Sequence, residues 1–186
     1  MIRYFHLTAV LLALVLAVGS LISPNPAGAA SAAEINRDVK IALEKLYAKS
    51  SSAKTLGEKA KGILVFPGIV KGGFMVGGQF GEGALLRGGK TVAYYNTLSA
   101  SYGLQIGIQK YGYALYFMSE PAMDWLNRSD GWELGTGPSI VVVDEGVAKS
   151  MSSTTLQSDV YAFFFDQKGL MGGLGLQGTK VSKIKK

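Results

Sequence analysis

The stretch from Lys71 to Lys90 reads "KGGFMVGGQFGEGALLRGGK", and its glycines fit two different structures. One is a loop that cradles phosphates, and the other is a glycine-rich strand. Alternation favours the strand, because Phe74, Val76 and Phe80 share one parity while the other parity is mostly glycine. The sequence therefore predicts a strand with one apolar face and one nearly bare face.

The same alternation recurs in two later stretches, "YGLQIGIQ" (102–109) and "GGLGLQG" (172–178). Glycine inside a strand marks a tight bend or a close approach by another backbone. Three such strands predict a strongly curved antiparallel sheet or a small barrel. Gly88 and Gly89 predict a hairpin turn. "GGLGLQGTK" is not a phosphate-binding loop, because Thr179 precedes Lys180, the reverse of the required order.

Helices are expected before this sheet. Residues 34–49 have an amphipathic pattern in which only Ile41 falls among the charges. A short helix is expected over 53–61, with Ser52 as its N-cap and Gly62 after its end. Further strands are predicted at "ILVFP", ended by Pro67, and at the segments "TVAYYNT", "YGYALYFM", "SIVVVDEG" and "DVYAFFFDQKG", with a short helix at "PAMDWLNR". The expected fold class is α+β with a mostly antiparallel sheet.

The first 32 residues have the layout of a secretory signal peptide. Arg3 and His6 precede an uncharged run over 7–22, and small residues then offer cleavage after Ala29 or Ala32. The predicted division is a signal peptide over 1–32 and one domain over 33–186, which places the protein in the periplasm or outside the cell. A retained N-terminal membrane anchor is the alternative, although this run of sixteen uncharged residues is short of the roughly 20 that span a bilayer.

The residue types argue against most enzyme designs. The sequence has no cysteine, and its single histidine, His6, lies in the predicted signal segment. Zinc and copper sites normally need imidazole or thiolate ligands, and common nucleophilic triads need a histidine base. We therefore predict no catalytic residue, no metal and no cofactor. An enzyme that used carboxylates alone would need a pair such as Glu82 and Glu133 to meet in one cleft.

The positive charge gathers at the two ends of the predicted domain. Residues 34–61 hold seven cations against four acids, residues 62–179 hold seven against nine, and residues 180–186 hold four against none. Basic ends around a nearly neutral centre predict contact with an anionic surface rather than with nucleic acid.

Seven ordered stretches resemble the SYLF domain family of lipid-binding proteins, which includes yeast actin-patch proteins. They are "AKGILVFP", "VGGQFGEGALL", "YYNT", "SYGLQIG", "SDGWELGTGPSIVVVDEGVAKS", "TTLQSDVYAFFF" and "QKGLMGGLGLQGTK". The resemblance covers residues 34–184. It implies a non-enzymatic domain that binds phosphoinositides or other anionic lipids through its N-terminal helix and nearby lysines.

By position, the resemblance and the charge distribution point to ten lysines as lipid-binding candidates: Lys40, Lys45, Lys49, Lys54, Lys59, Lys61, Lys180, Lys183, Lys185 and Lys186. In an exported protein, the expected partner is an anionic phospholipid of the cell envelope rather than cytoplasmic actin. The alternative is a structural or protein-interaction module of the envelope whose curved glycine face packs against a partner.

Overall fold

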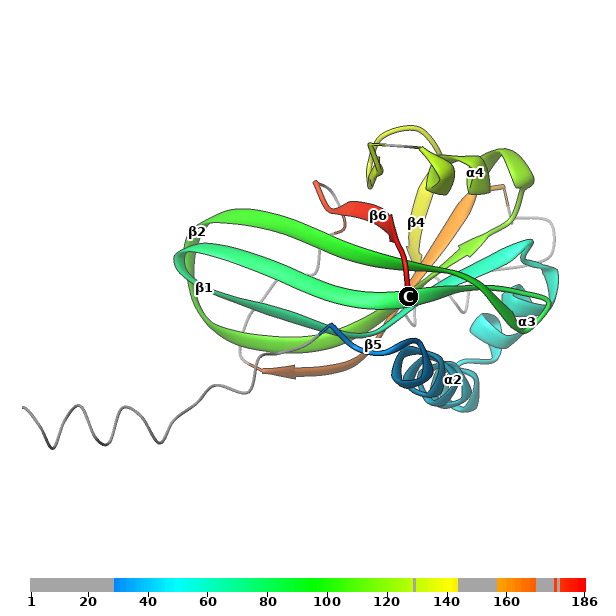
Figure 1. The fold of residues 1–186 in the computed structure, drawn as a ribbon, viewed down its shortest axis with the longest axis horizontal. Helices are drawn as coiled ribbons and strands as arrows, with labels where there is room; N and C mark the ends of the chain where they lie inside the picture. The colour runs from blue at the N-terminus through cyan, green and yellow to red at the C-terminus, as the bar shows by residue number, and fades with distance from the viewer. Residues whose placement is uncertain (1–28, 129, 144–156, 170–175, 177) are drawn as a thin grey trace, which may run out of the picture.

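The computed structural model describes residues 29–128, 130–143, 157–169, 176 and 178–186. Within them, two helices precede a curled sheet, as Figure 1 shows. The elements are α2 (Ala32–Lys49), α3 (Ser51–Lys59), β1 (Gly62–Arg87), β2 (Lys90–Phe117), α4 (Glu120–Asp124), a 3-10 turn η1 (Trp125–Asn127), β3 (Trp132–Glu133), β4 (Ile140–Val143), β5 (Val160–Gly169) and β6 (Lys180–Ile184). The fold is α+β with a strongly curved, mostly antiparallel sheet, as the sequence predicts.

The glycine-rich stretch belongs to a long two-stranded ribbon. β1 pairs antiparallel with β2 from Gly62–Phe117 to Arg87–Lys90, and the hairpin turn falls at Gly88 and Gly89, both with positive φ. The predicted strand and hairpin are confirmed. The predicted stop at Pro67 is wrong, because the strand continues past it with a register shift between Phe66 and Ile69. "TVAYYNT", "YGLQIGIQ" and "YGYALYFM" are likewise one strand rather than three.

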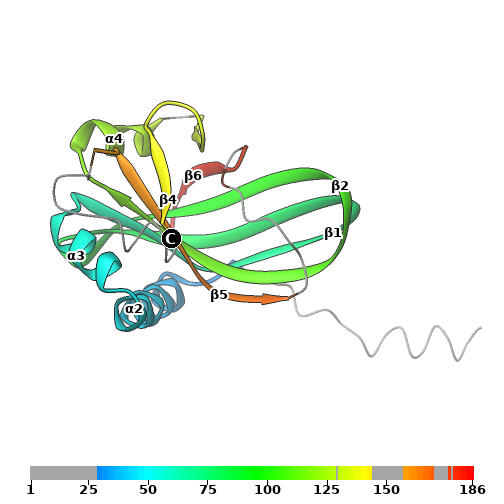
Figure 2. The same ribbon diagram turned by 180° about the vertical axis from the view of Figure 1, so that it is seen from behind.

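The ribbon folds back on itself, and both strands turn at the end far from α3 (Figures 1 and 2). A Cβ on Gly81 would lie 2.8 Å from the Gly68 carbonyl oxygen, and one on Gly83 would collide with the Val65 carbonyl oxygen. The two halves of β1 therefore touch backbone to backbone. Only glycine permits this approach, because any side chain would force the layers apart.

The remaining strands extend the sheet from the free edge of β2. β6 pairs with Tyr94–Leu98 of β2, and β5 pairs with its later part, Gln109–Phe117. β3 then joins β6, and β4 joins β5 as the one parallel pair of the described sheet. β4 is only partly buried, because Val142 is exposed and only Val143 of the strand is buried.

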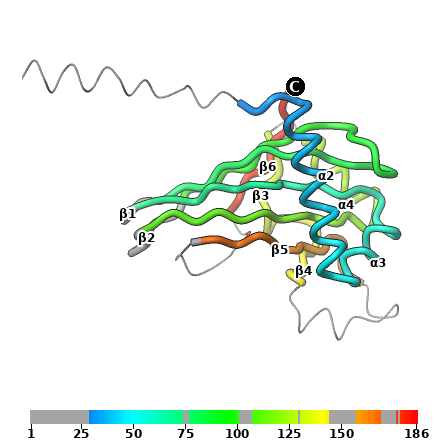
Figure 3. The backbone as a smooth tube through the Cα atoms, turned by 90° about the horizontal axis from the view of Figure 1, so that it is seen from below, coloured from blue at the N-terminus to red at the C-terminus, as the bar shows by residue number. Residues whose placement is uncertain are grey.

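Hydrophobic cores form on both faces of the sheet. Alternate residues of β2, such as Tyr113 and Leu115, join Trp132 and the α4 region on one face. Their neighbours, such as Ala114 and Tyr116, join the buried side of α2 and α3 on the other face. Figure 3 shows α2 lying across this second face. The alternating side chains of β2 thus contribute to two hydrophobic cores, and α2 and α3 complete one of them.

The helix boundaries differ slightly from those predicted. α2 begins at Ala32, two residues before the predicted start, and its N-cap is Ser31. The N-cap of α3 is Ser50 rather than Ser52, because the Ser50 hydroxyl accepts from the Ala53 N–H at 3.2 Å. The short helix after β2 is confirmed, with Ser119 as its N-cap and Pro121 in its first turn.

Candidate functional site

Helix α2 forms one wall of the candidate site, and its position is set by both its cap and its apolar face. Ile35, Val39, Ala42 and Leu46 are buried against the sheet. At the start of the helix, the Ser31 hydroxyl accepts from the Glu34 N–H at 3.3 Å, and Glu34 accepts from the Ser31 N–H at 2.8 Å. This reciprocal pair satisfies backbone donors that the first turn would otherwise leave free.

A groove of about 510 Å³ runs between α2 and β1. Its apolar lining is unusually exposed: Ile41 is 43% exposed, Val70 48% and Phe80 49%. Val70 and Phe80 come from opposite halves of the folded-back β1, so the groove depends on the ribbon's turn. Clustered exposed apolar side chains of this kind are typical of a contact surface for another molecule.

The acids around the groove are all paired with cations. Arg37 donates to Asp38 at 2.9 Å, and Lys45 and Lys49 approach Asp166 of β5 at 4.0 and 3.5 Å. Asp166 has a φ of 50°, which is uncommon for a residue other than glycine. The rim is therefore close to electrically neutral, with a small excess of cations.

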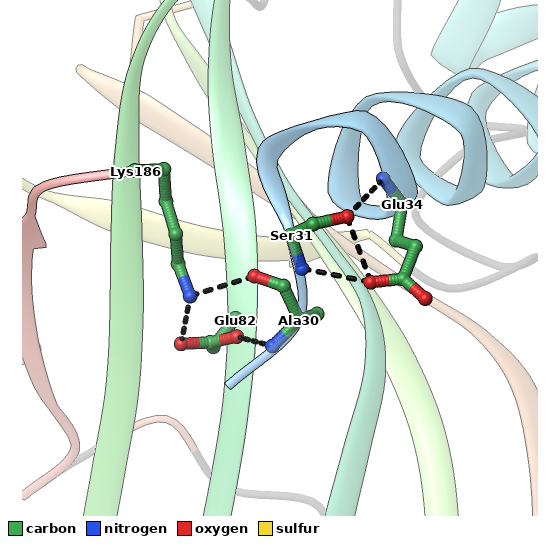
Figure 4. A network of polar contacts seen from close by, with 5 residues as sticks. All are labelled: Ala30, Ser31, Glu34, Glu82 and Lys186. Carbon is green, nitrogen blue, oxygen red and sulfur yellow. Dashed lines mark hydrogen bonds and ion pairs between the residues drawn. The ribbon is translucent and has the colours of Figure 1, made fainter. Parts of the chain in front are cut away.

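Two residues of the groove lining, Ala30 and Glu82, form a polar network with Lys186, shown in Figure 4. The Ala30 N–H donates to Glu82 Oε2 at 2.9 Å, and Lys186 Nζ donates both to Glu82 Oε1 and to the Ala30 carbonyl oxygen at 2.8 Å. The Glu82 and Lys186 side chains are only 12% and 9% exposed. The network joins the start of α2, the returning half of β1 and the end of β6.

The ten predicted lysines do not gather into one patch. Lys45 and Lys49 lie on one side of α2 and contact Asp166, whereas Lys40, five residues before Lys45, points about 140° away around the helix. The others lie at separate ends: Lys54 and Lys59 on α3, Lys61 just after it, Lys180 and Lys183 on β6, and Lys185 after β6, all exposed. Lys186 differs from the rest because its side chain is held by Glu82.

The groove is a site that the sequence did not predict. Its clearest signal was Ile41, the one apolar residue among the outward charges of α2, which the structure exposes. Val70 and Phe80 gave no separate signal, because each fits an ordinary strand pattern and only the folded ribbon brings them to one groove. Glu82 was considered with Glu133 as a catalytic pair, but its hydrogen-bond partners in the described structure are Ala30 and Lys186.

Inside the curl, a polar cluster lies among buried aromatic side chains. The Tyr111 hydroxyl donates to Gln79 Oε1 at 2.5 Å, and Gln79 donates to the Thr179 hydroxyl at 3.0 Å. Burial raises the pKa of Tyr111 to about 12, and burial also raises the pKa of Tyr113. Trp132 and Tyr95 are buried core residues. These polar groups satisfy one another and specify the packing of the core.

The described residues include neither a cluster of metal ligands nor a membrane-spanning helix. They contain no group of three or more histidine, cysteine, aspartate or glutamate residues placed to hold a metal ion. Among the helices described, none has the length and apolar character needed to cross a membrane. The predicted signal segment, apart from residues 29–32, lies outside the described residues.

The fold and the groove together define a binding module, with an open, exposed groove beside a helix rather than an enclosed polar cleft. Residues 98–186 match the model of the Ysc84 family, described as Las17-binding protein actin regulator. This matched part, a little under half of the chain, is similar to that family, which agrees with the SYLF resemblance of the sequence. No curated protein matches the chain.

The family match begins within β2 and includes every later element. Residues 29–97, which form α2, α3 and β1, precede it. They share its sheet, because β1 pairs with β2 along its length. The groove, which lies between α2 and β1 with Asp166 at its edge, therefore combines residues from before the matched region with one from inside it.

Proposed function

We propose that this chain is an exported, non-enzymatic module that binds anionic phospholipid surfaces peripherally. The observation that carries the proposal is the α2–β1 groove, whose exposed Ile41, Val70 and Phe80 lie beside the cations of α2. Apolar side chains enter the headgroup boundary while lysines meet lipid phosphates, which is how amphipathic segments bind at a membrane surface. The family, whose members are lipid- or actin-related binding modules, supports this class of function.

Neither kind of contact is sufficient alone. With Lys186 held by Glu82, the tail offers Lys180, Lys183 and Lys185, which contribute on the order of 1 kcal/mol each near an anionic surface. That corresponds to affinity weaker than about millimolar. Burying the exposed parts of the groove's apolar side chains adds a few kcal/mol, at about 25 cal/mol per Å². Stable binding then requires the groove and the lysines together.

Vesicle co-sedimentation tests the proposal with the chain from Ala30 onward, which contains all the described helices and strands. Phosphatidylcholine vesicles with graded phosphatidylglycerol are used at two salt concentrations. We expect binding that rises with anionic content and weakens with salt. Ile41→Ser with Phe80→Ser should weaken binding about tenfold. The matched control is Val92→Ser with Val142→Ser, at exposed positions outside the groove lining, which should bind as the unchanged chain does.

Equal binding to neutral and anionic vesicles would contradict the ionic part of the proposal. Equal effects of the groove and control variants would contradict the role of the groove. Failure to bind any vesicle would favour the alternative, a protein-interaction module. The family's description names a protein, Las17, as a binding partner and actin regulation as a role.

One observation favours that alternative beside the groove, around Leu98, the cross-strand neighbour of Phe80. Towards the turn of the ribbon, Leu98 is 56% exposed and Ile108 69% exposed, and a Cβ on Gly78 would meet no atom nearer than 3.5 Å. The face that Gly78 shares with Phe80 is open there and leaves room for a partner. Loss of a partner in Leu98→Ser with Ile108→Ser, with an unchanged melting temperature, would support it.

A further inference from the structure

We propose that the peptide bond between Ala29 and Ala30 is hydrolysed during export, and that the new α-ammonium group of Ala30 binds the carboxylate of Glu82. Water adds across the bond, so Ala29 leaves as a carboxylate and Ala30 gains an ammonium group, with no other reactant consumed. The proposal assigns both the processing site and a binding site for the mature N-terminus. It does not depend on lipid binding.

The sequence alone offers two cleavage positions, because small residues occupy both "AGA" (27–29) and "ASA" (30–32). The structure distinguishes them. Cleavage after Ala32 would remove Ser31, whose side chain caps α2, together with the whole of Ala30. Cleavage after Ala29 keeps the cap and every contact of the polar network of Ala30, Glu82 and Lys186.

Glu82 is placed to receive a terminal ammonium group. Its Oε2 already accepts from the Ala30 nitrogen at 2.9 Å, and its side chain is 12% exposed. In the unprocessed chain that nitrogen belongs to a neutral amide. In the processed chain it carries a positive charge, and a charge-assisted hydrogen bond in a partly buried place is roughly twice as strong as a neutral one.

The other contacts of Ala30 fix the position of its nitrogen. Lys186 donates to the Ala30 carbonyl oxygen and to the second oxygen of Glu82, both at 2.8 Å. The Ser31 N–H is held by Glu34 at 2.8 Å. The backbone that follows the Ala30 nitrogen is therefore anchored, whereas Ala29, which precedes it, is exposed. Removing the residues before Ala30 leaves this geometry intact.

The first experiment expresses the full chain in an exporting bacterial host and determines the N-terminus of the exported product by intact mass and N-terminal peptide analysis. We expect a product that begins at Ala30. A product that begins at Ala33, or a chain that is not cleaved, would overturn the proposal.

The second experiment compares two purified chains, one that begins at Ala30 and one that begins at Ala29. Both chains keep the hydrogen bond from the Ala30 nitrogen to Glu82. Only the chain that begins at Ala30 has a positive charge on that nitrogen. We expect the chain from Ala30 to melt about 2–4 °C higher, the shift that a modest ion pair produces in a domain of this size. Glu82→Gln should abolish the difference. An equal difference in that variant, or none in the unchanged pair, would overturn the pairing.

A pH series tests the ion pair between the Ala30 ammonium group and Glu82 even if Glu82→Gln does not fold. The titratable groups around Ala30 are Glu34, Asp38, Glu82 and Lys186, and they are common to both chains. The difference in melting temperature should therefore be present below about pH 8 and disappear as the α-ammonium group loses its proton at higher pH. A difference that persists unchanged to high pH would contradict the ion pair.

Discussion

Glycine has two different roles along the β1–β2 ribbon, and the neighbours of each glycine decide which. Gly81 and Gly83 face the backbone of the opposite half of β1, so a Cβ at either position would collide with main-chain atoms. Gly72 and Gly78 face open space, where a Cβ would meet ordinary contacts of 3.5–3.8 Å. The first pair holds the two layers together, and the second pair leaves a bare surface.

This difference predicts opposite outcomes for the same substitution. Gly83→Ala should lower the free energy of unfolding by about 1–3 kcal/mol, because the added methyl group forces the two halves of β1 apart. Gly78→Ala is the matched control, and its effect should stay within about 0.5 kcal/mol. Urea unfolding measures both. Similar losses for the two variants would contradict the close contact between the layers.

The sequence predicts the kind of role that glycine plays but not its location. Alternation alone shows a bare strand face and a close approach somewhere along it. The choice of Gly81 and Gly83 depends on where the ribbon turns back, which is a long-range property. The groove could not be predicted from the sequence for the same reason. Val70 and Phe80 are ten residues apart in one strand and line one groove only because the strand turns back.

Among the elements, α2 has the most clearly defined start. Its capping box joins Ser31 to Glu34, and the backbone hydrogen bond from Ser31 is the main cause of a lowered pKa for the Glu34 carboxyl. A carboxyl whose pKa is lowered in the folded state stabilises the fold above its unfolded pKa, and that contribution is lost as the pH falls through the folded value. The start of α2 should therefore weaken in acid.

The prediction is a difference between two chains across pH. The urea midpoint of the unchanged chain should fall more steeply below pH 4.5 than that of Glu34→Gln, because glutamine keeps the capping hydrogen bond but does not titrate. The two chains should respond alike above about pH 6. Parallel curves throughout the acid range would show that the Glu34 charge does not contribute to the cap.

Element type is easier to predict from this sequence than element length. The amphipathic pattern of α2 and the turn at Gly88–Gly89 are local features, and both are confirmed. Pro67 and Gly68 resemble a strand end, yet β1 accommodates them at a register shift and continues to Arg87. A shift of this kind depends on the partner strand, so the sequence of β1 alone does not show it.

At the scale of the whole molecule, the two faces of the sheet are covered by different kinds of side chain. The face under α2 and α3 is closed by helix side chains, whereas the inside of the curl contains buried tyrosines and the cluster of Gln79, Tyr111 and Thr179. The predicted antiparallel, curved sheet is correct, but alternation could not assign a helix to one face and polar groups to the other. That assignment depends on long-range packing, because α2 and α3 precede β1 whereas Thr179 of the polar cluster follows β2.

The buried tyrosines make the folded state sensitive to strong base. Burial raises the pKa of Tyr111 to about 12, from 10 when exposed, so the folded chain binds more protons than the unfolded chain between these values. Stability should therefore be intact below pH 10 and fall as the pH rises from 10 to 12, by on the order of 2 kcal/mol from Tyr111 alone.

Absorbance at 295 nm should show a late tyrosine phase that coincides with loss of the folded circular-dichroism signal. In Tyr111→Phe the late phase should shrink by one tyrosine. Full titration of every tyrosine near pH 10 without unfolding would show that water reaches the inside of the curl.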